Sequence, residues 1–346
     1  MMKVIYSDQH KLRNAQFELL GGVLVRPFER PERIDYILER LKERKFHDII
    51  PPKEFDMTLV KKIHKADYLD FLENGFAEWK AEGYEGDMVA TSWPARRMVD
   101  DRLPDNIDGK VGYYALASET MIDKGTWQAA LVSKDVALTG AEMIANGSEK
   151  MVFSLCRPPG HHATADMFGG YCFLNNAAIV AQYMRDQAAK KVAILDIDVH
   201  HGNGIQDIFY ERNDVLYVSI HGRPQDTYPY FLGYDDENGK GMGEGANKNY
   251  PIAAGGKYDV WGQALIDGLQ TIQDFGTEAL IISLGTDAFE KDPIGPLKLT
   301  SDDFFTIGQT IANVSLSTHI IMEGGYAIKE IGINAVNFLE GMLEKK

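Results

Sequence analysis

The sequence contains only two cysteines, Cys156 and Cys172, among its 346 residues. A disulfide scaffold and a structural zinc site built from thiolates are therefore excluded. Long apolar runs are also missing, since none approaches the roughly 20 residues that a membrane-spanning helix needs. Charged residues come too early at the N-terminus for a signal peptide. We expect a cytoplasmic protein that does not associate with membranes.

Basic residues are scarce relative to acidic ones: 36 Lys and Arg stand against 51 Asp and Glu, which gives a formal net charge of -15. This excess argues against a nucleic-acid partner and favours cationic ones. Apolar residues make up 45% of the chain and charged residues 25%, as in a soluble globular protein with a sizeable core. We find no internal repeat or credible linker, and therefore expect a single domain over residues 1–346.

Short apolar runs rich in branched residues alternate with helical patterns along the chain. The runs that read as buried strands are Met151–Cys156, Val192–Leu195, Val215–Ile220, Leu280–Leu284 and His319–Met322. Helical periodicity covers Ala129–Ala145, Asn176–Lys190 and Trp261–Phe275, and another helix is expected to start near Thr300. This alternation predicts an α/β fold, a single domain with an open, mostly parallel β-sheet and helices on both faces.

Residues 81–110 break this pattern, because they carry Gly, Pro and dense charge without periodicity. A loop of that length in a compact domain is usually functional or an interaction surface. A mobile surface excursion is the alternative, and the composition alone does not choose between the two.

Polar residues follow each predicted strand at its carboxyl end, where open parallel sheets bind ligands. The motifs are Arg157-Pro158-Pro159-Gly160-His161-His162, Asp196-Ile197-Asp198-Val199-His200-His201-Gly202-Asn203-Gly204, His221, Gly285-Thr286-Asp287 and Glu323-Gly324-Gly325-Tyr326. Five of the nine histidines lie in these motifs. Chance rarely gathers polar groups on one side of a sheet so consistently, so we expect the functional site at this edge.

Asp198 and His200 are two positions apart on an extended segment, so their side chains point the same way. With Asp287 from another strand end they offer three ligands and leave one coordination position free, which is typical of a catalytic metal site. An Asp-X-His pair alone is more often structural. The adjacent pair His161-His162 and the third ligand Asp287 reverse that preference.

The His161-His162 pair follows a Pro-Pro-Gly turn that can aim both imidazoles into a cleft. A histidine beside a metal can accept a proton from water and later return it to a leaving amine. Asp196 and Asn203 are natural acceptors that would fix the imidazole tautomers. Tyr326 follows two glycines, and its hydroxyl could donate to a carbonyl oxygen.

Taken together, these motifs resemble those of the histone deacetylase superfamily of metal-dependent amidohydrolases. Further matching pieces are Arg33, His64-Lys65-Ala66-Asp67-Tyr68-Leu69, Gly170-Tyr171-Cys172-Phe173-Leu174-Asn175-Asn176 and Asp292-Pro293. The resemblance implies an arginase/deacetylase-like fold. Glu323 departs from the glycine that many members carry before Gly-Gly-Tyr. That variant, with Asn203 and the long early insertion, looks most like the bacterial acetylpolyamine amidohydrolases.

The resemblance implies one zinc ion held by Asp198, His200 and Asp287, with Fe²⁺ or Co²⁺ as possible substitutes. Phe289 stands where a two-metal site would want another carboxylate, which argues for a single metal. A structural potassium ion is also implied. Its ligands would be the side chains of Asp196 and Ser219 and the backbone carbonyls of Asp198, His200 and Ile220.

The implied roles of the remaining residues follow the same matching positions. Tyr326 would polarise the substrate carbonyl, and His162 would act as general base and then as general acid. His161, paired with Asp196, would supply electrostatic assistance. The walls of a narrow tunnel would be Gly170, Tyr171 and Tyr228.

The acidic excess favours cationic substrates, and the resemblance implies N-acetylated polyamines of the acetylputrescine, acetylcadaverine and acetylspermidine type. Glu119, Asp108 and Glu18 are the expected contacts for a distal ammonium. The insertion at about 81–110 would pair with its copy in a homodimer and narrow the mouth of the tunnel. Two alternatives stay open: a lysine deacetylase or broad acyl-amine amidohydrolase, and a non-catalytic scaffold. The intact set of ligands, histidines and Tyr326 argues against the scaffold.

Overall fold

A computed structural model describes residues 2–344 and contains one eight-stranded sheet. In sheet order its strands are β4 (Ile49–Ile50), β1 (Lys3–Ile5), β5 (Met151–Ser154), β10 (Ser317–Met322), β9 (Ala279–Leu284), β6 (Val192–Asp196), β7 (Val215–Gly222) and β8 (Asn247–Ile252). All neighbouring pairs in this sheet are parallel. A separate antiparallel hairpin joins β2 (Glu18–Leu20) to β3 (Val23–Val25).

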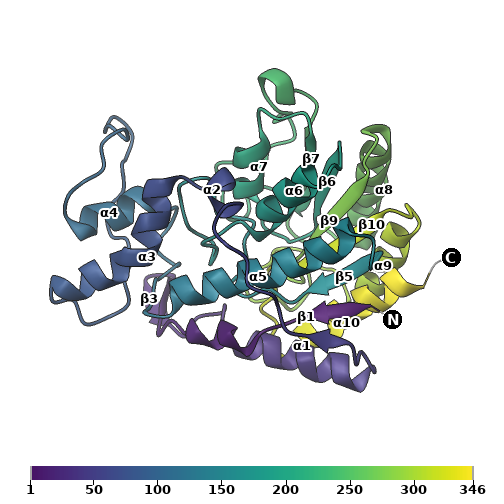
Figure 1. Cartoon of the computed structure of the whole chain (residues 1–346), viewed down its shortest axis with the longest axis horizontal. Coiled ribbons are helices and arrows are strands. Elements are labelled where there is room, and N and C mark those ends of the chain that lie inside the picture. Colours follow the sequence, from purple (N-terminus) through teal and green to yellow (C-terminus); the bar gives the residue numbers. More distant parts are fainter. Residues whose placement is uncertain (1, 345–346) are drawn as a thin grey trace.

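Helices lie on both faces of the sheet (Figure 1). They are α1 (Glu32–Glu43), α2 (Val60–Ile63), α3 (Ala66–Ala81), α4 (Ile107–Tyr114), α5 (Thr126–Ala145), α6 (Asn176–Asp186), α7 (Asn203–Phe209), α8 (Tyr258–Asp274), α9 (Ser301–Ala312) and α10 (Ile331–Leu343). Short 3₁₀ turns occupy Asp8–Leu12 and Gly241–Gly243. Within residues 2–344, no helix combines the length and apolar character needed to cross a bilayer.

Side-chain alternation along the strands builds two separate cores. In β6, Ala193 and Leu195 pack in one core with helices α1, α8, α9 and α10. Val192 and Ile194 point to the opposite face and pack with α3, α5 and α6. Because successive residues of a strand face opposite sides, a strand buried on both faces must be apolar throughout. This explains the continuous apolar runs in the sequence and confirms the predicted fold class.

The predicted elements are confirmed, with boundaries that shift by a few residues. Thr300 caps α9 through a capping box with Asp303, as the start signal indicates. The edge strands β4 and β8, and β1 next to β4, were not predicted from the sequence. Two of them have only two or three residues, and β8 (Asn247–Ile252) mixes polar residues with a proline, so none shows a long apolar run.

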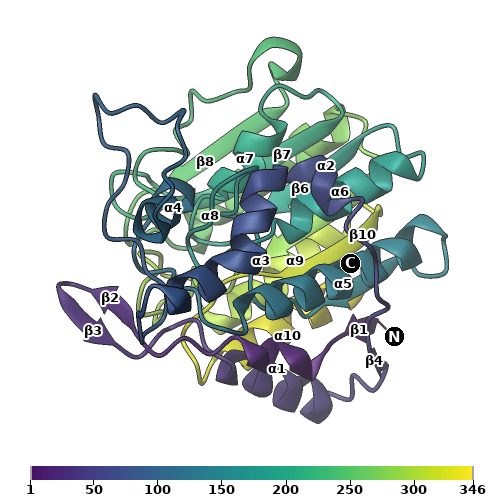
Figure 2. The same ribbon diagram turned by 60° about the vertical axis from the view of Figure 1, so that its left-hand side comes forward.

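The atypical stretch 81–110 is largely a loop. Between the end of α3 at Ala81 and the start of α4 at Ile107, the regular pairing consists of a single bridge from Met88 to Ile122. The loop extends away from the body, on the same side as the β2–β3 hairpin (Figure 2). Its exposed apolar residues include Met98 and Val99, each 65% exposed.

Candidate functional site

The predicted site lies at the carboxyl ends of four neighbouring strands, β5, β10, β9 and β6. The loops that follow these strands carry the predicted catalytic and metal-binding residues. A cavity of about 430 Å³ opens onto them, and its lining includes His162, His200 and Tyr326. The sheet order therefore brings together residues that are far apart in the sequence.

Asp198, His200 and Asp287 form a buried cluster whose ligand atoms lie within 4.8 Å of one another. Nδ1 of His200 lies 3.2 Å from Oδ1 of Asp198 and 3.2 Å from Oδ2 of Asp287. Among the described residues, Oδ2 of Asp287 accepts no well-aligned hydrogen bond, and its contact is the ion pair with His200. Because buried carboxylates need a compensating charge, two of them with one imidazole fit a divalent cation bound between the three groups.

Backbone amides hold both carboxylates in place. The N–H of Val199 donates to Oδ1 of Asp287 at 2.9 Å, and the N–H of Gly324 donates to Oδ2 of Asp198 at 2.8 Å. A Cβ atom on Gly324 would lie 2.3 Å from Oδ2 of Asp287 and 2.5 Å from Oδ2 of Asp198. Glycine is required at 324 because any side chain would displace the proposed metal ligands.

The two adjacent histidines have different partners. Nδ1 of His161 lies 3.1 Å from Oδ2 of Asp196, whereas Nδ1 of His162 lies 2.8 Å from Oδ1 of Asn203. Burial lowers the pKa of His161, but Asp198 and Asp196 outweigh it and raise that pKa to about 10. Burial and the positive charges of His161 and His200 hold the pKa of His162 well below its usual value. The pair is thus split into a charged and a neutral imidazole.

Tyr326 enters the cavity from the turn after β10. Its own N–H and that of Ala327 donate to Oδ2 of the buried Asp292, at 2.7 and 3.0 Å. The guanidinium of Arg33 lies 4.9 Å from the centre of the Tyr326 ring. Burial raises the pKa of Tyr326 well above its usual value, so its hydroxyl is a neutral donor.

The three predicted tunnel residues, Gly170, Tyr171 and Tyr228, all line the cavity. The ring of Tyr228 meets that of His162 edge-on at 4.9 Å. Gly170 has a φ of +53°, and a Cβ atom there would lie 2.1 Å from the His162 ring. Because Gly170 has no Cβ atom, its backbone can lie directly against the imidazole of His162.

Two of the three predicted ammonium contacts, Glu18 and Glu119, line the same cavity. The Glu119 carboxylate accepts from the N–H of Gly170 at 3.2 Å. Burial raises the pKa of Glu18 to about 7, and the negative charge of Glu119 also raises it. Asp108 does not line the cavity of its own chain. It lies in the first turn of α4 and accepts a hydrogen bond from Tyr84 at 2.5 Å.

The residues expected to bind potassium lie on adjoining strands. Asp196 and Ser219 are partners in the register of β6 and β7. Oδ1 of Asp196 accepts from the N–H of Asp198 at 3.2 Å, and Oγ of Ser219 lies 2.8 Å from Nδ1 of His221. Both residues are buried, and the role of the set, including Ile220, stays a prediction.

A buried ionic cluster behind the Tyr326 turn was missed by sequence reasoning. Glu29 accepts hydrogen bonds from Arg13, Arg33 and Arg157, all of them buried. Burial raises the pKa of Glu29, but the three guanidinium groups outweigh it and lower that pKa to about 2. Arg33 also donates to the carbonyl of Gly325 at 2.7 Å, so the cluster supports the turn that carries the tyrosine.

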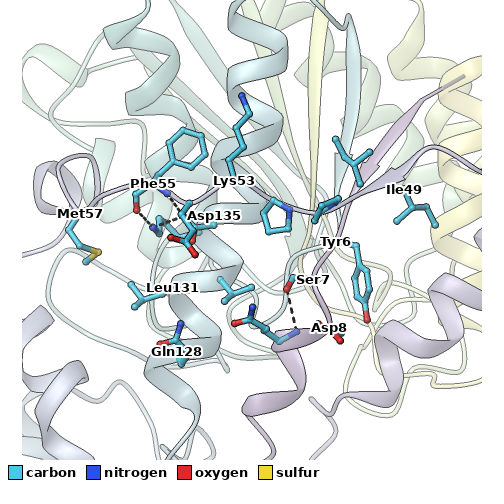
Figure 3. Close-up of a pocket in the computed structure, with 17 residues that line it drawn as sticks. Tyr6, Ser7, Asp8, Ile49, Lys53, Phe55, Met57, Gln128, Leu131 and Asp135 are labelled. Carbon is cyan, nitrogen blue, oxygen red and sulfur yellow. Dashed lines mark hydrogen bonds and ion pairs between the residues drawn. The ribbon is translucent and has the colours of Figure 1, made fainter.

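A second, larger pocket of about 700 Å³ lies at the carboxyl ends of β1 and β4, against α5 (Figure 3). Its two buried charges neutralise each other, since Nζ of Lys134 lies 2.6 Å from Oδ1 of Asp135. Nζ of Lys134 also donates to the carbonyl of Phe55 at 2.6 Å. None of the predicted catalytic or metal-binding residues lines this pocket.

Comparisons with known proteins agree with the geometry of the site. Residues 27–342 match the histone deacetylase domain. The chain is 54% identical to an acetylpolyamine amidohydrolase of Mycoplana ramosa, over 99% of both chains. It is 50% identical to acetylpolyamine amidohydrolase 2 of Pseudomonas aeruginosa, over 98% of both chains. The crystal structure of an acetylpolyamine aminohydrolase from Burkholderia pseudomallei superposes with a TM-score of 0.92 at 36% identity, covering 99% of this chain and 98% of that one.

Proposed function

This chain belongs to the histone deacetylase family, and from that premise we propose that it is a zinc-dependent amidohydrolase acting on N-acetylated polyamines. Its products would be acetate and the free amine. The observation that carries the proposal is one cavity whose lining includes two acids and a histidine of the metal cluster. Glu18, Glu119 and His200 all line it, and His200 belongs to the buried cluster with Asp198 and Asp287.

A zinc ion bound by Asp198, His200 and Asp287 would supply a Lewis acid that polarises the acetyl carbonyl and increases the acidity of water. Two carboxylate ligands reduce the net charge of such a site, so a second electrophile is useful. The neutral Tyr326 hydroxyl serves this purpose by donating to the carbonyl oxygen as negative charge develops there. Fe²⁺ or Co²⁺ suits the same ligands. A structural potassium ion at Asp196 and Ser219 remains part of the proposal.

His162 carries the proton in this proposal. Because Nδ1–H of His162 donates to the amide oxygen of Asn203, its Nε2 atom is free to accept the proton of the attacking water. The same atom then donates that proton to the leaving amine. His161 stays positively charged against Asp196 and so stabilises the negative charge of the transition state.

In this proposal, the two acids that line the cavity select the substrate. Acetylated polyamines are slender cations, and Glu119 and Glu18 offer negative charge beside a cavity walled by Tyr171 and Tyr228. Burial strengthens such attraction because the local dielectric is low. The relatives named acetylpolyamine amidohydrolase support this choice over an acetyl-lysine peptide.

The test compares acetylputrescine with N-pentylacetamide, in which a methyl group replaces the ammonium. Glu119→Gln should lower kcat/KM for acetylputrescine about tenfold and leave N-pentylacetamide unchanged. Glu54→Gln, an acid of the second pocket, is the matched control and should change neither. Equal losses on both substrates would refute selection by charge at Glu119. Faster turnover of an acetyl-lysine peptide than of acetylputrescine would favour the lysine deacetylase alternative.

We also propose that the loop at about 81–110 pairs with its copy in a homodimer and narrows the mouth of the cavity. Exposed Met98 and Val99 on this loop support a protein contact, because large apolar side chains gain by leaving water. Light scattering should give a dimer for the wild type and a monomer for the double variant Met98→Asp, Val99→Asp. A monomeric wild type would refute this part of the proposal.

A further inference from the structure

Glu323 is a fully buried carboxylate that does not line the cavity. It follows directly on β10, the strand between β5 and β9. Its Oε2 atom accepts from the N–H groups of Gly160 and His161 at 2.7 and 3.2 Å. Its Oε1 atom accepts from Oγ of Ser283 in β9 at 3.1 Å. One side chain thus joins the histidine turn to the neighbouring strand.

Gly324, the residue after Glu323, contacts the metal-binding cluster. The N–H of Gly324 donates to Oδ2 of Asp198, the proposed metal ligand, at 2.8 Å. The dipeptide 323–324 therefore holds the backbone before His162 through its carboxylate, and holds Asp198 through its amide. These two attachments fix the distance between the proton carrier and the metal ligands.

A glycine at 323 would leave the same two amides without this acceptor. Both amides are buried, and a buried N–H without a partner costs free energy that a small movement of the turn would relieve. Such a movement would carry the imidazoles of His161 and His162 with it, since both follow directly on Gly160. Misplacing a catalytic group by about 1 Å can lower the rate about 100-fold.

We propose that Glu323 is a positioning residue, which holds the turn of His161 and His162 at a fixed place relative to Asp198 by accepting two backbone hydrogen bonds. The proposal rests on the proposed amide hydrolysis for its effect on rate. It needs an acceptor oxygen at this place, not a negative charge. Glu323→Gln should therefore preserve the function that Glu323→Ala removes.

The experiment measures kcat, KM and bound zinc for the full-length, zinc-loaded variants on acetylputrescine. Glu323→Ala should lower kcat about 100-fold while KM and zinc content stay near wild type, and Glu323→Gln should stay within about fivefold. The proposal is overturned if Glu323→Ala keeps wild-type kcat, or if Glu323→Gln is as impaired as Glu323→Ala.

Hydrogen exchange followed by mass spectrometry adds a readout that needs no activity. The peptide covering residues 157–164 should exchange faster in Glu323→Ala than in the wild type, and at the wild-type rate in Glu323→Gln. If the wild type hydrolyses no acetylated amine, the proposed function fails, but the exchange rates still test whether Glu323 holds the histidine turn. If exchange in Glu323→Ala were unchanged, the positioning role of Glu323 would be overturned, and the proposed function would not be affected.

Ser283→Ala keeps the test decisive if Glu323→Ala does not fold. Removing this hydroxyl frees the carboxylate to rotate, so kcat should fall about fivefold. Ser154→Ala is the matched control, because Ser154 is an equally buried hydroxyl whose partners are His319 and the carbonyl of Val136. The proposal is overturned if Ser283→Ala behaves like Ser154→Ala.

Discussion

The cavity of the candidate site and the second, larger pocket both lie at the carboxyl ends of the sheet strands. The larger of the two is not the candidate site. In the pocket of about 700 Å³ beside β1 and β4, Lys134 and Asp135 neutralise each other. At the cavity of about 430 Å³ beside β9 and β6, two buried carboxylates, those of Asp198 and Asp287, share the single imidazole of His200, which lines the cavity. Two buried carboxylates beside one imidazole, more than the volume of a pocket, therefore mark the place where a cation would bind.

The largest expected effect comes from removing a proposed ligand in the smaller cavity. Asp198→Ala should abolish stoichiometric zinc and lower kcat/KM at least about 1,000-fold, because the cation contributes several kcal/mol to the transition state. Elemental analysis and initial rates measure both. Full zinc content in this variant would show that Asp198 does not hold the cation.

A smaller loss is expected when the proton carrier is removed and the ligands are kept. His162→Ala should lower kcat about 1,000-fold or less, with zinc content unchanged, because the imidazole transfers a proton without holding the cation. Steady-state kinetics and elemental analysis separate it from Asp198→Ala. If His162→Ala also lost its zinc, the division between ligand and proton carrier would be wrong.

Glu18, a buried acid that lines the cavity, should give a modest pH effect. Burial raises the pKa of Glu18 to about 7, so this carboxyl is neutral below pH 7 and negative above it. Attraction to an ammonium therefore increases with pH, and KM for acetylputrescine should fall about threefold from pH 6 to pH 8. Glu18→Gln should show no such fall, and neither should the wild type with N-pentylacetamide. An identical KM profile in the variant would exclude Glu18.

The smallest effect on activity is expected in the larger pocket. Asp135→Ala should leave kcat/KM within twofold, because no proposed catalytic group touches it. It should still lower the free energy of unfolding by about 3 kcal/mol, since it removes the charged partner of the buried Lys134. Urea denaturation measures this cost. A large loss of activity in a stably folded variant would show that the larger pocket has a catalytic role.

The sequence predicts those parts of the site whose residues lie close together in the chain. Asp198 and His200 share one extended segment, and the apolar run before them identifies the strand end on which they lie. The hydrogen bonds that hold the turns of the site in place could not be predicted, because they join residues far apart in the chain. Glu323 meets Gly160 across 163 positions, and Arg157 meets Glu29 across 128.

These long-range contacts follow from the order of the strands, which is not their order in the chain. β10 lies between β5 and β9, and this places the turn of Tyr326 between the histidine turn and Asp287. Apolar runs predict that strands exist but do not predict which strands are neighbours. For the same reason, the position of Asp108 outside its own chain's cavity could not be foreseen from its acidic side chain.

Anomalous diffraction at the zinc absorption edge, from crystals grown with zinc, is the sharpest test of the proposed metal site. We expect a peak about 2.0–2.2 Å from Nδ1 of His200 and from one carboxylate oxygen each of Asp198 and Asp287. Zinc bound elsewhere, with no peak between these three residues, would contradict it.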